Sequence, residues 1–157
     1  MAMAKAAGGE VRHLKLHGAL SNMSSEDESM ARALYEAALS VDPDIRIMVL
    51  AATAQERAVQ SLGCNYAAEI FADRAYNDDA TLVDRSKPGA VIHDAAYAAK
   101  RMVEMVQAGA IITESGKHIP SRIDTICVHG DNAEAVALAR AVKAGLIEAG
   151  VAVRTFA

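Results

Sequence analysis

Three short stretches at the ends of strand-like runs contain side chains that can take part in acid–base chemistry or bind an anion. They are Lys15 and His17 in KLHG, Asp73 and Arg74 in ADR, and His129 and Asp131 in VHGD. A carboxylate beside a histidine can orient the imidazole and stabilise its charged form, which gives acid–base chemistry near neutral pH. We therefore take His17, Asp73, His129 and Asp131 as candidate catalytic residues. Lys15 and Arg74 are candidates for binding a substrate carboxylate or a developing oxyanion.

These residues also have structural interpretations. Asp131 could cap the helix that follows it, while Gly130 allows the turn. His17, before a glycine, could be a turn histidine, and Asp73 could form a local ion pair with Arg74. We assign no metal ligands, because none of the usual closely spaced histidine motifs occurs. His17, Asp73 and His129 could still form a metal site from separate strands, so the use of a metal stays open.

Strand-like runs alternate with helix-like runs along the chain. The expected strands are Val11–His17, Ile45–Ala52, Ala67–Asp73, Ile123–His129 and Val151–Phe156. Helix starts are expected at the capping-box pairs Ser25/Glu28, Thr53/Glu56 and Asp131/Glu134, and at the N-cap Asp94; helix ends are expected at Gly63, Gly109 and Gly150. Residues 75–93 are expected to be irregular, and 115–117 to form a polar connector. Such alternation predicts an α/β fold of parallel strands with crossover helices, as one domain over residues 1–157.

The faces of the strands distinguish two α/β architectures. In VRHLKLH, Leu14 and Leu16 share one face, while His13, Lys15 and His17 share the other. A polar face toward the carboxyl end of a strand is typical of a (β/α) barrel, whose active site lies at that rim. An open flavodoxin-like sheet, with strands buried on both faces, is the alternative.

Composition excludes several classes of function. The net charge is −4 and no basic stripe stands out, which argues against nucleic-acid binding; Lys100, Arg101 and Lys117 have the setting of solvated surface residues. No signal peptide or membrane-spanning segment is evident, so we expect a cytoplasmic protein without membrane partners. The chain contains no P-loop and no dinucleotide-binding fingerprint.

Three segments resemble one known family. KLHGALSNM, FADRAYNDDATLVDRSKPGAVIHD and DTICVHGDNAEAVALAR are similar to segments of the LamB/YcsF family, the A subunit of bacterial 5-oxoprolinase. The resemblance implies part of an irregular (β/α) barrel of the glycoside hydrolase/deacetylase type. It also implies that the chain works with subunits B and C to open the lactam ring of 5-oxoproline to glutamate, using ATP.

The chain departs from the family pattern in two ways. Leu16 and Ser21 stand where the family usually has proline and tyrosine, and the family's N-terminal motifs are absent. The chain thus resembles the C-terminal portion of a family member, with MAMAKAAGGE as the tail of a helix. We expect the chain to be either a subunit of the enzyme, or part of one, or a non-catalytic folded remnant or interaction module. In each case we expect the chain to be inactive by itself. Five strands do not close a barrel, so we also expect a homo-oligomer, as a two-fold dimer.

Overall fold

The computed structural model describes residues 1–130 and 134–155. The chain divides into two compact units, Met1–Ala68 and Glu69–Ala157, and the division falls within strand β3 (Tyr66–Phe71). Asp131 and Phe156, which the sequence singled out, lie outside the described residues.

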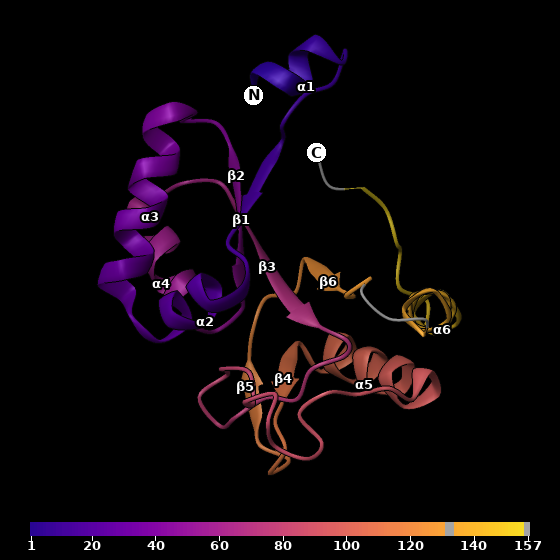
Figure 1. Cartoon of the computed structure of the whole chain (residues 1–157). Coiled ribbons are helices and arrows are strands. Elements are labelled where there is room, and N and C mark those ends of the chain that lie inside the picture. Colours follow the sequence, from indigo (N-terminus) through magenta and orange to yellow (C-terminus); the bar gives the residue numbers. More distant parts are fainter. Residues whose placement is uncertain (131–133, 156–157) are drawn as a thin grey trace. The chain divides into compact units, whose positions relative to one another are not determined.

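The first unit is a set of parallel strands with their connecting helices (Figure 1). Its elements are α1 (Ala2–Ala6), β1 (His13–Lys15), α2 (Gly18–Glu26), α3 (Glu28–Val41), β2 (Arg46–Leu50), α4 (Ala54–Leu62) and the first residues of β3. Strands β1 and β2 pair in parallel, with Leu14 opposite Ile47. In the same view α2, α3 and α4 all lie on one side of β1 and β2, as crossover connections require.

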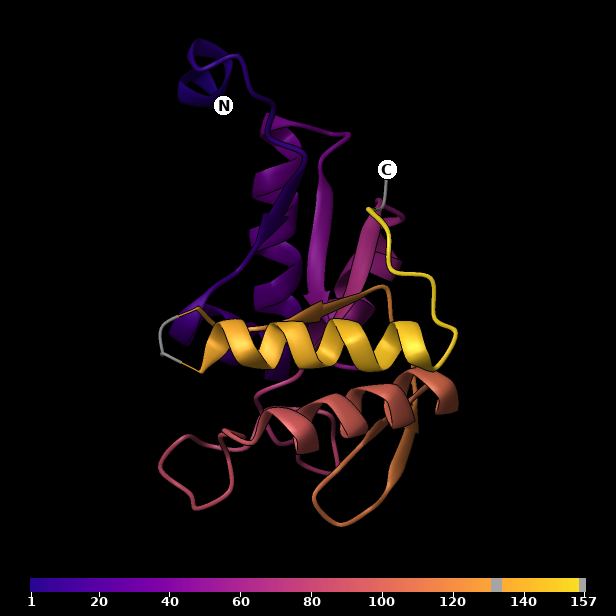
Figure 2. The ribbon, with the colours of Figure 1, turned by 90° about the vertical axis from the view of Figure 1, so that its right-hand side faces the viewer.

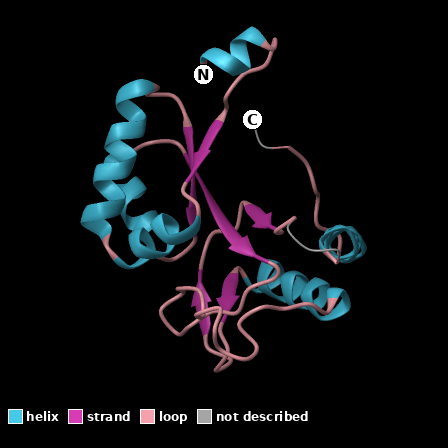
Figure 3. Ribbon diagram, in the orientation of Figure 1, coloured by secondary structure: helices cyan, strands magenta, loops and turns pink. Residues whose placement is uncertain are grey.

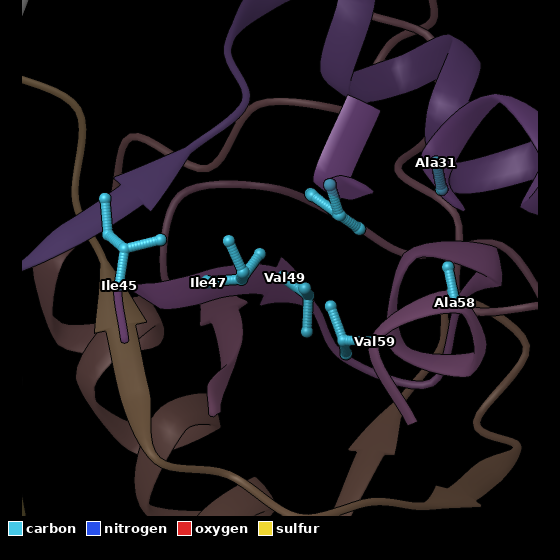
Figure 4. Close-up of a cluster of buried hydrophobic side chains, with 7 residues drawn as sticks. Ala31, Ile45, Ile47, Val49, Ala58 and Val59 are labelled. Carbon is cyan, nitrogen blue, oxygen red and sulfur yellow. The ribbon is translucent and has the colours of Figure 1, made fainter. Parts of the chain in front are cut away.

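The core of this unit forms between β2 and the helices. Ile47 and Val49 alternate along β2 and are buried against Ala58 and Val59 of α4 (Figure 4). Leu14 and Leu16 pack against the same cluster. The apolar face predicted for residues 11–17 is therefore the face that meets the core.

Local signals set the helix ends in this unit, with one exception. The Thr53 hydroxyl accepts a hydrogen bond from the Gln55 N–H, and Gly63 ends α4 with a φ of 66°, a left-handed conformation that glycine adopts without strain. The expected cap at Ser25 is wrong: Ser25 lies inside α2 and donates to the Asn22 carbonyl. Asp27 caps α3 instead, since its carboxylate accepts from the Met30 N–H.

The second unit pairs the end of β3 with a distant strand. Its elements are the remaining residues of β3, α5 (Ala95–Ala108), β4 (Ala110–Ile112), β5 (His118–Pro120), β6 (Thr125–Cys127) and α6 (Ala135–Glu148). Strands β3 and β6 run parallel, with Phe71 opposite Cys127, and the strand order of the sheet is β1-β2-β3-β6. Figure 3 shows β4 and β5 as a separate pair, which is antiparallel.

Helices α5 and α6 pack along each other (Figure 2). Met102 and Met105 are buried on α5, and Leu138 and Val142 are buried on α6. Gly145 of α6 faces α5, and a Cβ at this position would meet ordinary van der Waals contacts, 3.5 Å from Val103 Cγ2 and 3.6 Å from Ala99 Cβ.

One expectation for the second unit is wrong: residues 151–155 form no strand. The polar connector at residues 115–117 is the turn of a hairpin, whose strands β4 and β5 were not predicted. The irregular segment was predicted correctly: residues 75–93 contain only isolated bridges, such as Tyr76 with Leu82. No described helix has the length and apolar character needed to cross a membrane.

Candidate active site

Asp73 and His129 form a hydrogen-bonded pair in the second unit. Each lies two residues beyond the paired positions Phe71 and Cys127, and the bond from Ala72 N–H to the Cys127 carbonyl extends the ladder toward them. His129 Nδ1 lies 2.7 Å from Asp73 Oδ2. The pairing of parallel strands therefore brings together two of the side chains predicted to be catalytic.

The surroundings of the pair favour proton transfer. The Asp73 side chain is only 7% exposed, whereas that of His129 is 29% exposed, so the imidazole is the accessible partner. With Nδ1 held by the carboxylate, Nε2 is the nitrogen left to exchange a proton with a bound molecule. The Phe71 ring stacks on the imidazole, with centroids 5.5 Å apart, and restricts its orientation.

One oxygen of this pair lacks a partner. Among the described residues, Asp73 Oδ1 is buried and makes no hydrogen bond. A buried carboxylate oxygen without a partner is costly, and such atoms are found where a site stores strain or receives another group. Asp73 Oδ1 is therefore an acceptor atom that no described residue occupies.

Arg74 is buried and directed at the loop that follows it. Its Nη2 donates to the Val83 carbonyl at 2.6 Å and its Nε donates to the Ala90 carbonyl at 3.3 Å. Burial lowers the pKa of its guanidinium, and nearby Arg85 adds to the effect, although Asp73 opposes it. Within the described part of the chain Arg74 is not in ion-pair contact with Asp73. Its predicted role in substrate binding stays a prediction.

Lys15 and His17 belong to the first unit. Lys15 is half-buried on β1, and His17 is exposed at the N-terminal end of α2 without a side-chain cap bond. Their grouping with Asp73 and His129 at one rim stays a prediction, as do the roles assigned to them.

Arg101 does not have the solvated setting that its sequence neighbours indicate. It is buried, not solvated, and its guanidinium lies over the Tyr76 ring, 5.4 Å from the centroid. A signal was available, because Arg101 shares its helix face with the buried residues Ala98 and Met105, at spacings of three and four. Arg101 and Tyr76 also line a cavity of about 490 Å³.

Three comparisons place these motifs among known proteins. A model of the LamB/YcsF family matches residues 1–157. The chain is 65% identical over 156 residues to a 5-oxoprolinase A subunit from Ruegeria pomeroyi, covering 99% of this chain and 62% of that protein. It is 52% identical over 153 residues to the 5-oxoprolinase A subunit of Gluconobacter oxydans, covering 98% of this chain and 60% of that protein.

A solved structure extends the likeness to the fold. The crystal structure of a lactam utilization protein from Thermus thermophilus matches with a TM-score of 0.84 and 37% sequence identity, over 99% of this chain and 62% of that one. The match confirms the predicted fold class, parallel strands with crossover helices as part of an irregular (β/α) barrel, over the flavodoxin-like alternative. The chain spans less than two thirds of the length of these relatives.

Proposed function

Because the chain belongs to the LamB/YcsF family, we propose that it serves as the A subunit, or as part of one, in an ATP-dependent 5-oxoprolinase that opens the lactam of 5-oxoproline to give glutamate. The names of its relatives support the substrate, and the Asp73–His129 pair is the observation that carries the chemistry. The partners proposed are subunits B and C, in a cytoplasmic complex.

The pair fits the proton transfers that lactam hydrolysis needs. As water attacks the lactam carbonyl, a C–O bond forms and the water must lose a proton; as the C–N bond breaks, the nitrogen must gain one. His129 Nε2 can accept the first proton and deliver it to the nitrogen, while Asp73 holds the ring and stabilises its charged form. Lys15 and Arg74 remain proposed substrate-binding residues, as donors to the developing oxyanion, with His17 and Asp131 as further acid–base candidates.

We propose that the whole complex, and not this chain alone, opens the resonance-stabilised lactam ring. No P-loop sequence occurs in this chain, and we propose that ATP is bound with the help of another subunit. The purified chain is therefore expected to release no glutamate from 5-oxoproline, with or without ATP. Turnover by the chain alone at about 1 per second or more, an ordinary enzyme rate, would refute this assignment.

The decisive experiment measures ATP-dependent glutamate release by the chain together with subunits B and C. The substitutions Asp73→Asn and His129→Asn are expected to lower kcat by about a hundredfold or more, the usual contribution of a general acid–base residue. Asp84→Asn is the matched control: this exposed carboxylate follows Asp73 in the same loop and accepts hydrogen bonds from the N–H and hydroxyl of Ser86. Equal rates for Asp73→Asn and wild type would remove the pair from the mechanism.

A non-catalytic role in the same family is the second candidate. It is favoured by Leu16 and Ser21, which flank the candidate residue His17 in the motif where the family usually has proline and tyrosine. Complete inactivity of the wild-type chain with both partner subunits, alongside intact complex formation, would support this candidate over the first.

We also propose that the chain forms a two-fold homodimer. Strands β1 and β6 stand at the two ends of the strand order, and strand edges favour association. Light scattering is expected to give twice the chain mass of 16.5 kDa. A monomer at all micromolar concentrations would overturn this proposal.

A further inference from the structure

The cavity beside Arg101 is built entirely within the second unit. It has a volume of about 490 Å³, lies against α5 and the irregular segment, and is lined by Tyr76, Gly89, Arg101, Thr113 and Glu114 among others. This volume falls within the range of ordinary small-molecule sites. The lining combines apolar and polar groups, as expected where a small ligand is held in one orientation.

Arg101 places a poorly satisfied positive charge on this cavity. The residue is only 8% exposed, and its one hydrogen bond among the described residues is a long one, 3.4 Å from Nη1 to the Phe71 carbonyl. A guanidinium carries five N–H donors, and the Tyr76 ring offers only its face. No carboxylate within the described ranges lies in ion-pair contact with it. Because a buried charge is stable only when it is paired, the arrangement points to an anionic ligand.

The rim of the cavity has the opposite charge. Glu114 is exposed, and its Oε1 lies 3.9 Å from where a Cβ on Gly89 would be. Asp94, also exposed, already accepts bonds from the Ala96 and Tyr97 N–H groups. These solvated carboxylates are screened by water, so they do not cancel the attraction of a buried guanidinium for an anion. They do favour a ligand that turns an N–H group toward the rim.

We propose that this cavity binds a small lactam acid or amino acid, with Arg101 holding its carboxylate at the buried end and Glu114 facing its N–H group. The identity of the ligand as a lactam acid rests on the proposed function; the anion site itself rests on Arg101 and the cavity. Ile92, which lines the cavity, donates its N–H to the Asp73 carbonyl, so the cavity adjoins the Asp73–His129 pair. Arg101 is thus a substrate-binding residue that the motifs did not reveal.

The test is a titration of the full chain with small ligands, monitored through the NMR signals of the arginine side-chain Nε–Hε groups. Three probes separate the contributions: L-5-oxoproline, 2-pyrrolidinone, which lacks the carboxylate, and cyclopentanecarboxylate, which lacks the lactam. L-5-oxoproline is expected to shift the Arg101 signal. 2-Pyrrolidinone is expected to bind roughly tenfold to a hundredfold more weakly, which is the affinity lost with one charge-assisted hydrogen bond.

Two variants and one control complete the design. Arg101→Gln is expected to weaken L-5-oxoproline binding by the same factor of about ten to a hundred, and Arg101→Lys by less. Lys100→Gln removes one positive charge from the neighbouring, exposed position of α5 and is expected to bind like wild type. Thermal unfolding monitors whether each variant is folded, and the wild-type titration stands even where a variant is not.

The possible outcomes distinguish the anion site at Arg101 from the proposed lactam-opening function. If L-5-oxoproline binds Arg101→Gln as tightly as wild type, or if neither carboxylate probe shifts the Arg101 signal at millimolar concentrations, the inference is overturned and the proposed function is untouched. If cyclopentanecarboxylate binds through Arg101 as tightly as L-5-oxoproline, the anion site stands but the lactam function loses its support.

Discussion

Replacing Arg74 with methionine separates a structural role from a substrate-binding role. Methionine retains much of the apolar stem and removes the guanidinium that bonds to the Val83 and Ala90 carbonyls. We expect the variant to lose stability because these bonds tie together the irregular segment that follows β3.

The magnitude follows from the two bonds. The short bond to the Val83 carbonyl, 2.6 Å, is charge-assisted and buried, and such a bond contributes about 1.5–3 kcal/mol. The longer bond to the Ala90 carbonyl contributes less, since the Ala75 N–H also donates to that oxygen. Desolvation of the guanidinium offsets part of this gain, so the expected loss is about 2–3 kcal/mol.

The assay is urea unfolding followed by circular dichroism, with two comparison variants. Arg74→Lys is expected to recover about half of the loss, because an ammonium cannot reproduce the fork that reaches two carbonyls. Arg85→Met removes an exposed cation from the same loop and is expected to change stability by less than about 0.5 kcal/mol.

If Arg74→Met unfolds at the urea concentration of wild type, the guanidinium is dispensable to the loop and the structural role is refuted. A loss of ligand binding in that variant would then identify Arg74 as a substrate-binding residue, as its place after β3 first indicated.

Substitutions at two further positions, Gly145 and Tyr35, test the packing of each unit by the same unfolding assay. Gly145→Ala is expected to raise stability by about 0.5–1 kcal/mol, since its Cβ meets ordinary contacts at 3.5 and 3.6 Å and alanine favours helix; Gly145→Leu should lower it by about 1–3 kcal/mol through overpacking. A destabilising Gly145→Ala would mean that α5 and α6 approach more closely than described. Tyr35→Phe is expected to be neutral or to add up to about 1 kcal/mol, because Tyr35 Oη is buried and makes no hydrogen bond within the described residues; a clear loss would reveal a partner such as a bound water.

The sequence predicted those features that short-range chemistry decides. Thr53 and Asp94 cap helices where their side chains suggested, and Gly63 and Gly109 end helices in left-handed conformations. The Asp73–His129 pair was also predictable, since parallel strands align their carboxyl ends.

Features that depend on distant partners were not predictable in this way. VAVRT alternates like a strand, but residues 151–155 join no ladder, and nothing local reveals whether a pairing edge is available. The hairpin strands β4 and β5 have three residues each, too few to show a period. The spacing of Arg101 from Ala98 and Met105 indicates a buried helix face, but only tertiary packing shows that its guanidinium lies over the Tyr76 ring.

The pairing of β3 with β6 also has a consequence for the order of folding. The strands of the first unit follow one another along the chain, whereas Asp73 and His129 are 56 positions apart and meet only after the intervening segment closes on itself. Closing such a long loop costs conformational entropy before the contacts of the ladder can stabilise the chain. This ladder is therefore expected to form late, after the local helices. The proposed acid–base pair is then assembled by one of the last folding events in the second unit, and a chain still emerging from the ribosome before residue 129 cannot carry it.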